Sequence, residues 1–143
     1  MDIRILDISH FERIKTLLKK YKSSINESII NENQFDELKN AILNNRITFY
    51  TIHNDNDVIG MCSISTIFST YKCDLVGMFD DFFIDIEYRK KGYARELVNY
   101  VFDDMKNRKI NSVLVGCSEI DVKMYKKLGF DMEIGYLLSW RGI

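Results

Sequence analysis

The sequence lacks several features that would define its class at once. Its 143 residues contain no proline, three cysteines and two histidines, and 20 Lys+Arg against 21 Asp+Glu leave a formal net charge of -1. The odd cysteine count and wide spacing argue against a disulfide framework and a zinc clip, so we expect reduced thiols, no metal site and a cytoplasmic protein. The balanced charge gives no bulk electrostatic drive toward a nucleic-acid partner.

Long apolar runs are also missing. Charged residues interrupt every apolar stretch well before the ~20 residues of a membrane span, and Met1–Arg4 lacks the basic-then-apolar order of a secretory signal. We therefore expect no membrane partner. The chain does have 46% hydrophobic and 29% charged residues, the composition of a globular protein, and no repeat or linker divides it. We predict a single domain over residues 1–143.

The hydrophobic pattern predicts an α/β fold with a mixed sheet. The predicted strands span residues 2–7, 46–53, 58–68, 73–86, 110–117 and 130–140. A helix is predicted over 9–21, where Ser9 opens a capping box, another over 33–44, a long amphipathic one after Gly92, and a last one over 119–128 that ends at Gly129. The helix between the fourth and fifth strands makes those two strands parallel. The final segment could instead be a hairpin around Gly135.

One loop carries most of the chemical information. It joins the fourth strand to the long helix and reads Arg89-Lys90-Lys91-Gly92-Tyr93-Ala94. Unpaired N–H groups at a helix start, the positive end of the helix dipole and the clustered basic side chains form a site for an anion. Gly92 lets a ligand approach the backbone closely. The loop alone is compatible with a pyrophosphate cradle or with an ordinary strand–helix turn.

Two motifs together resemble those of a known family. Arg89-x-x-Gly92-x-Ala94 opens the long helix, and a later segment contains Tyr125-x-x-x-Gly129-Phe130. In these motifs and in the order of its elements the chain resembles the GNAT family of acyl-CoA-dependent N-acetyltransferases. The resemblance implies the GNAT fold: a mixed, mostly antiparallel sheet of six to seven strands with a splayed parallel pair, flanked by about four helices.

The resemblance also implies acetyl-CoA (coenzyme A) as cosubstrate. The backbone of the fourth strand is expected to bind the pantetheine arm, and the amides of residues 90–95 are expected to bind the pyrophosphate. Ser118 stands where many family members have an asparagine near the cofactor. The implied cofactor-binding residues are Phe82, Phe83, Ile84, Arg89, Lys90, Lys91, Gly92, Tyr93, Ala94, Arg95 and Ser118.

Acetyl transfer to an amine needs a proton acceptor for the amine, and a proton donor helps the thiolate to leave. The resemblance makes the Tyr125 hydroxyl the donor, because it matches the family position beside the cofactor sulfur. Strand alternation puts Asp80 on one face with Phe82 and Asp81 on the other face with Phe79. We expect Asp80 to be the base, while Asp81 and a water relay stay open as alternatives.

The sequence leaves the acceptor open as a small-molecule or peptide primary amine, and Asp80, Asp81 and Asp85 favour a cationic one. Two rival interpretations are an acyl-CoA-binding module without turnover and a small α/β protein whose loop binds another phosphate ligand. The apolar residues 136–140 would form a hydrophobic sheet edge, which predicts a homodimer joined through the C-terminal strand.

Overall fold

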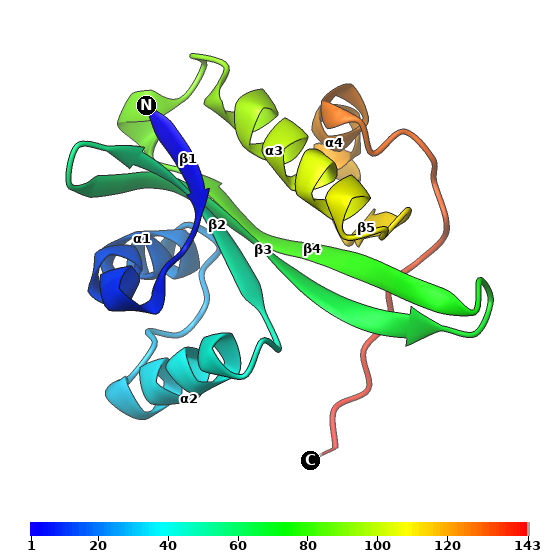
Figure 1. Cartoon of the computed structure of the whole chain (residues 1–143), viewed down its shortest axis with the longest axis horizontal. Coiled ribbons are helices and arrows are strands. Elements are labelled where there is room, and N and C mark those ends of the chain that lie inside the picture. Colours follow the sequence, from blue (N-terminus) through cyan, green and yellow to red (C-terminus); the bar gives the residue numbers. More distant parts are fainter. Residues whose placement is uncertain (143) are drawn as a thin grey trace.

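Five strands form one sheet in which neighbours along the chain are also neighbours in space (Figure 1). The computed structural model describes residues 1–142. The strands are β1 (Asp2–Ile5), β2 (Thr48–Asn54), β3 (Asp57–Ser69), β4 (Asp74–Ile84) and β5 (Val113–Val115). The first four pair antiparallel, and β4 pairs with β5 in parallel. The predicted mixed sheet is confirmed, with five strands instead of six to seven.

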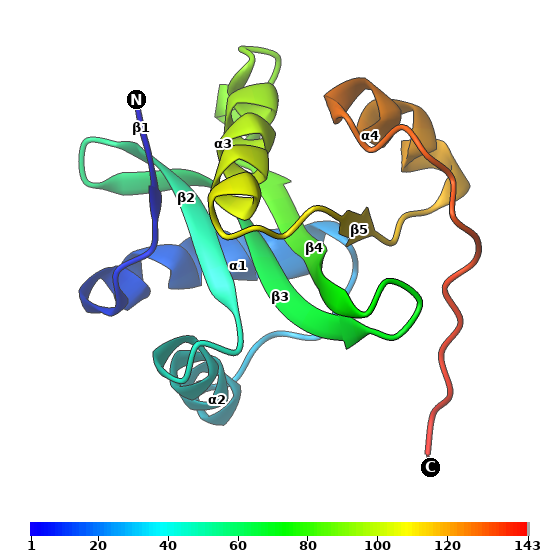
Figure 2. The same ribbon diagram turned by 45° about the vertical axis from the view of Figure 1, so that its right-hand side comes forward.

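Helices cover both faces of the sheet, and each face has its own apolar core. One core lies between the sheet and α1 (Phe11–Ser24) with α2 (Glu32–Leu43). The other lies beneath α3 (Tyr93–Asn107) and α4 (Val122–Leu128) (Figure 2). The apolar stripe predicted for the long helix is confirmed, because its buried residues recur every three to four positions: Leu97, Val98, Val101 and Met105. Within residues 1–142, no helix is both long enough and apolar enough to cross a bilayer.

The first helix starts later than predicted, and a different residue caps its entry. The carboxylate of Asp7 accepts hydrogen bonds from the backbone N–H and the hydroxyl of Ser9, at 2.9 and 2.6 Å. Ser9 therefore does not cap α1, and a 3-10 turn, η1 (Ile8–His10), precedes the helix. The capping box lies instead at the start of α2, where the side chains of Asn31 and Gln34 each bond to the other's backbone N–H.

The C-terminal quarter differs most from the prediction. Residues 119–128 form a 3-10 turn, η3 (Glu119–Asp121), and then α4, which ends at Gly129 with a left-handed φ of 118°, as predicted. The expected strand over 130–140 is not formed: residues 131–142 run away from α4 without strand pairing (Figure 2). Among residues 1–142 no strand lies beyond β5, which has only three residues, so the described sheet ends there in a short, unpaired edge.

A bulge in β4 changes the direction of its side chains. The register with β3 shifts between residues 61 and 63, so that β4 has one residue more than β3 at this point. Asp81 lies in the bulge with a φ of 54°. Phe79 and Phe82 consequently share one face, with ring centroids 5.3 Å apart. The predicted alternation, with Asp80 beside Phe82 and Asp81 beside Phe79, is wrong because an extra residue reverses the faces after it.

Candidate functional site

A cleft of about 670 Å³ opens where β4 and β5 diverge. The two strands pair over only three residues, ending at Phe79 and Val115. Beyond this point β4 continues to Ile84, while the chain after β5 turns toward α4. The cleft is lined by these two diverging segments, by the C-terminal end of α1, by the start of α3 and by α4. It therefore connects a helix N-terminus to the aspartates of the bulge.

Nearly all the residues predicted for the site come together in this cleft. Those that line it are Asp80, Phe82, Phe83, Ile84, Arg89, Lys90, Gly92, Tyr93, Ala94, Arg95, Ser118 and Tyr125. Lys91 is not among them, and its ammonium group lies 5.5 Å from the ring centroid of Tyr88.

The loop before α3 has the backbone geometry of an anion site. Lys90 and Gly92 have left-handed φ angles of 62° and 87°. Gly92 precedes α3 without a side-chain cap, so the first N–H groups of the helix are free to bind a ligand. A Cβ atom on Gly92 would meet nothing within 4 Å, which leaves the space before the helix open. This set of donors fits the pyrophosphate of a nucleotide cofactor.

The side chain of Arg89 points back to the protein. Its Nε donates a 2.8 Å hydrogen bond to the carbonyl of Ile84, and its guanidinium carbon lies 5.1 Å from the ring centroid of Phe83. The N–H of Asp85 bonds to the carbonyl of Ile59 on β3, so the alternating main-chain groups of Ile84 point away from β3 and into the cleft. The Ile84 carbonyl is thus already engaged, and its N–H is the group left for a ligand.

Tyr125 joins an aromatic cluster to the cleft. Its ring packs edge-on against Phe79 and Phe130, with centroids 6.4 and 5.7 Å apart. Burial raises the pKa of the Tyr125 hydroxyl above its ordinary value, and the nearby charge of Asp121 raises it further. The phenol therefore keeps its proton at neutral pH and can donate it.

The two aspartates of the bulge have different environments. Asp81 is half-buried, and its carboxylate accepts a 2.6 Å hydrogen bond from the Ser63 hydroxyl. Asp80 is exposed, and its carboxylate accepts the backbone N–H of Asp81 at 2.8 Å. Burial raises the pKa of Asp81, the bond from Ser63 opposes that shift, and the charge of Asp80 adds to it.

Tyr21 also lines the cleft, although the sequence analysis does not name it as a site residue; it is the last residue of the helix predicted over 9–21. Its ring packs on Phe83, with centroids 5.9 Å apart, and burial followed by the charges of Asp80 and Asp81 raises the pKa of Tyr21 to about 12. Ser24 lines the cleft as well. A tyrosine that ends an apolar helix face was the one available signal, since its hydroxyl needs a polar surrounding.

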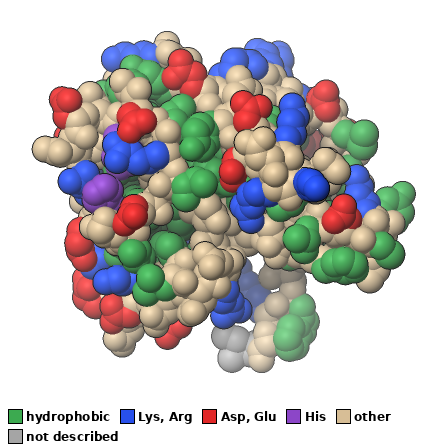
Figure 3. Space-filling view, in the orientation of Figure 1, with side chains coloured by type: hydrophobic (Ala, Val, Ile, Leu, Met, Phe, Trp, Pro, Cys, Tyr) green, Lys and Arg blue, Asp and Glu red, His purple; other side chains and the backbone are tan. Residues whose placement is uncertain are grey.

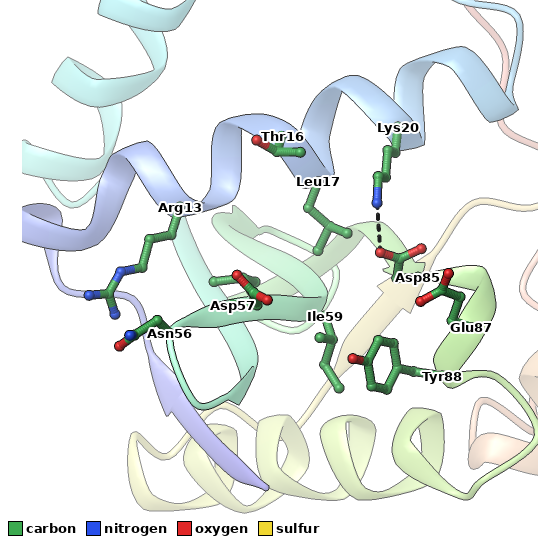
Figure 4. Close-up of a pocket in the computed structure, with 11 residues that line it drawn as sticks. Arg13, Thr16, Leu17, Lys20, Asn56, Asp57, Ile59, Asp85, Glu87 and Tyr88 are labelled. Carbon is green, nitrogen blue, oxygen red and sulfur yellow. Dashed lines mark hydrogen bonds and ion pairs between the residues drawn. The ribbon is translucent and has the colours of Figure 1, made fainter.

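A second hollow of about 370 Å³ lies behind the loop that leads to α3 (Figure 4). It lies between α1, the start of β3 and residues 85–88, and a 2.8 Å ion pair joins Lys20 to Asp85 there. Asp85 therefore lies outside the cleft, contrary to the expectation that it would favour a cationic acceptor. Lys20 lies on α1 and Asp85 directly follows β4, so the ion pair links α1 to the segment that leads to the anion site. Tyr88, in the same segment, lines both hollows.

Residues 11–130 match the sequence profile of the Acetyltransferase (GNAT) family. The chain belongs to this family. No curated protein sequence matches it significantly.

Solved structures share the GNAT fold over almost the whole chain. One described as a probable acetyltransferase is 19% identical with a TM-score of 0.88, covering 100% of both chains. A Clostridium acetobutylicum protein, described as a predicted acetyltransferase and solved with acetyl-CoA, is 18% identical with a TM-score of 0.81, covering 98% of this chain and 95% of its own. An aminoglycoside acetyltransferase from an uncultured soil metagenomic sample, in complex with sisomicin, is 11% identical with a TM-score of 0.85. The match covers 99% of this chain and 95% of that enzyme's chain.

Proposed function

We propose that the protein is an acetyl-CoA-dependent N-acetyltransferase that moves the acetyl group directly to a primary amine while both substrates are bound. One observation carries the proposal: a single cleft connects an uncapped helix N-terminus in a basic loop to a protonated tyrosine and a pair of carboxylates. The first part suits the pyrophosphate of coenzyme A. The second suits the proton transfers of aminolysis.

When bound, acetyl-CoA supplies an activated acetyl thioester. The N–H groups at the start of α3, with Lys90 nearby, would hold the pyrophosphate. The unpaired edge at the end of β4, including the N–H of Ile84, would bond the pantetheine arm in the manner of an added strand. Ser118, on the opposite wall of the cleft, would contact the cofactor from the side of β5.

Tyr125 is proposed as the group that gives a proton to the departing thiolate, because its raised pKa keeps the hydroxyl protonated. For the base we now favour Asp81 over Asp80. A carboxylate with a raised pKa is a stronger proton acceptor, and the bond from Ser63 fixes its position. The amine proton would pass to Asp81 directly or through one water molecule.

The carboxylates that line the cleft favour a cationic acceptor. Asp80, Asp81 and Asp121 line the cleft, and the hydroxyl of Tyr21 adds a polar group. We propose a small-molecule or peptide primary amine that carries further positive charge, because carboxylates that do not receive the reacting proton can bind a second ammonium group. The likeness to an aminoglycoside acetyltransferase bound to sisomicin is consistent with this class.

The test is a thiol-release assay with acetyl-CoA against a panel of polyamines, aminoglycosides and peptides with free amino groups. We expect amine-dependent release of coenzyme A that Tyr125→Phe slows. Binding of acetyl-CoA by calorimetry without turnover on any amine would instead identify an acyl-CoA-binding module. If ATP or NAD stabilises the fold against heat as well as acetyl-CoA does, the proposal is wrong.

We also propose that the enzyme acts in the cytoplasm as a homodimer joined through its C-terminal residues. Cys62, Cys73 and Cys117 all lie in the described part of the chain and are free thiols, which suits a reducing compartment.

A further inference from the structure

The hollow between α1, the start of β3 and residues 85–88 carries charged groups that are available to a ligand. Its volume of about 370 Å³ lies in the range of small-molecule sites. Arg13, Asp57 and Glu87 line it, and within residues 1–142 none of the three forms an ion pair. Lys20 and Asp85 also line it, but they pair with each other. Among the described residues, the hollow therefore offers one free cation and two free carboxylates.

The free charges lie on two sides of the hollow (Figure 4). Arg13 of α1 and Asp57 of β3 lie toward one end, and Glu87 lies beside Asp85 at the other end. The bond from Lys20 to Asp85 raises the pKa of Lys20, burial opposes this shift, and the charges of Asp85, Glu87 and Asp57 add to it. Both free carboxylates therefore lie within electrostatic reach of the Lys20 ammonium group.

An apolar surface joins the two ends. The side chains of Leu17, Val58 and Ile59 line the hollow and are at most 8% exposed. In Figure 4, Leu17 and Ile59 lie between the charged ends, with the ring of Tyr88 beside them. A short hydrocarbon chain can pack on this surface while its charged ends stay in contact with the rim.

We propose that the hollow binds a free α-amino acid with a cationic side chain, of the chemical class of lysine. The α-carboxylate would accept hydrogen bonds from Arg13, the α-ammonium group would donate to Asp57, and the side-chain cation would donate to Glu87. A diamine would leave Arg13 without an anion, and a dicarboxylic acid would place a second negative charge against the carboxylates. A cationic amino acid matches all three free charges with one molecule.

The selectivity of the hollow depends on its own charges. Positive and negative side chains are interspersed over the face shown in Figure 3, so no field of one sign draws a ligand to that face from a distance. A ligand held in the hollow connects α1 to residues 85–88, the segment that leads to the anion site. It thereby adds a second bridge beside the ion pair of Lys20 and Asp85.

Calorimetry on the full chain tests which groups of the ligand are recognised. L-lysine is compared with three analogues that each lack one charged group: cadaverine lacks the carboxylate, Nα-acetyl-L-lysine the α-ammonium group and L-norleucine the side-chain cation. Each analogue should bind at least about threefold more weakly than L-lysine, because one charge-assisted hydrogen bond is lost. No binding of L-lysine at millimolar concentration, or an analogue that binds within threefold of it, overturns the inference.

Substitutions then assign each group to its partner. Arg13→Gln should weaken L-lysine by at least about threefold and leave cadaverine, which has no carboxylate, almost unchanged. Glu87→Gln should weaken L-lysine equally and leave L-norleucine almost unchanged. Glu37→Gln, on the exposed face of α2, is the control for the loss of a surface carboxylate and should change neither affinity. If Arg13→Gln weakens cadaverine as much as L-lysine, the carboxylate does not bind there and the inference is wrong.

The carboxylates of the cleft could bind the same cations, so the place of binding needs its own measurement. Asp80→Asn should leave the affinity for L-lysine within about twofold, and L-lysine should shift the amide resonances of residues 13–17 and 56–59. Loss of binding in Asp80→Asn but not in Glu87→Gln would place L-lysine in the cleft and overturn the inference. The titrations contain no acetyl-CoA, so a chain that binds L-lysine in the hollow but never turns over acetyl-CoA would refute the proposed function alone.

Discussion

The Ser63 hydroxyl donates a 2.6 Å hydrogen bond to the Asp81 carboxylate at the bulge of β4. The bond fixes a half-buried acid whose pKa burial raises, and the bulge places that acid in the cleft. A native pKa above the unfolded value means that the fold prefers the protonated acid. Asp81 thus stabilises the fold at acid pH, and this contribution is lost as the pH rises through the native pKa.

Asp81→Asn should therefore separate activity from stability. The amide cannot accept the amine proton, so kcat should fall by roughly two orders of magnitude. The thermal midpoint at neutral pH should rise by about 2 °C, because the half-buried charge is gone, and the difference should shrink toward pH 4. Asp80→Asn is the matched control, since Asp80 is exposed: it should chiefly raise the KM for the amine. If Asp80→Asn instead lowers kcat and Asp81→Asn chiefly raises the KM, Asp80 is the base.

Substitutions of Gly92 test the anion site. The φ of 87° strains any other residue, so Gly92→Ala, Gly92→Gln and Gly92→Glu should all lose about 1–2 kcal/mol of unfolding free energy. Only Gly92→Glu brings negative charge to the helix start, and it should abolish acetyl-CoA binding. Calorimetry on the three folded variants isolates the effect of charge from that of strain. Equal affinities for Gly92→Gln and Gly92→Glu would place the pyrophosphate elsewhere.

Tyr125→Phe removes the proposed acid and keeps the ring in its aromatic cluster. Turnover should fall by roughly one to three orders of magnitude, because the thiolate then leaves without a positioned proton donor. The dissociation constant for acetyl-CoA should stay within about twofold of wild type. Tyr21→Phe removes the other tyrosine hydroxyl of the cleft, serves as the control and should alter mainly the KM for the amine. Unchanged turnover in Tyr125→Phe would assign protonation of the thiolate to solvent.

The ion pair between Lys20 and Asp85 supports the anion site from behind (Figure 4). The side chain of Lys20 is 52% exposed, so the coupling of the pair should be only about 0.2–1 kcal/mol in a double-mutant cycle. Lys20→Met should accordingly weaken acetyl-CoA binding by no more than about fivefold. Asp85→Asn and the double variant should weaken it by the same factor, because each of the three variants removes the same ion pair. Lys19→Met is the neighbouring control, because Lys19 lies over the ring of Phe35 instead. If Lys19→Met lowers the affinity for acetyl-CoA more than Lys20→Met does, the ion pair does not position the anion site.

Local patterns made much of this site predictable. The apolar stripe of α3, the turn at Gly129 and the glycine before α3 are encoded within a few residues, and each lies where the sequence predicts it. The strand–helix–strand crossover also made the parallel pair of β4 and β5 predictable.

What the sequence did not predict depends on contacts between distant segments. The bulge that turns Asp81 toward Ser63 is a property of how β3 pairs with β4, and strand alternation alone cannot show it. Tyr21 enters the cleft because of the path of α1 across the sheet. Residues 131–142 have the alternation of a strand but do not pair with the open edge of β5, and alternation alone cannot show whether a segment pairs with a sheet.

His53 on β2 gives a pH prediction that is independent of the cleft. Its side chain is 2% exposed, Nε2 lies 2.8 Å from the Thr51 hydroxyl, and Nδ1 has no partner within residues 1–142. Burial lowers the pKa of His53 from 6.5, the positive charge of Arg4 lowers it further, and Asp2 opposes these effects. His10 and Arg13 add smaller effects in the same direction as burial.

A lowered native pKa means that the fold prefers neutral imidazole, whereas the unfolded chain takes up a proton near its ordinary value. The contribution of His53 is therefore complete above about pH 6.5 and is lost as the pH falls toward the native pKa. His53→Gln removes the titrating group, so the drop in thermal midpoint from about pH 7.5 to about pH 5 should be smaller than in wild type. His10→Gln is the control for losing a histidine, because it leaves the buried ring in place. If both variants flatten the pH dependence equally, the burial of His53 is not its cause.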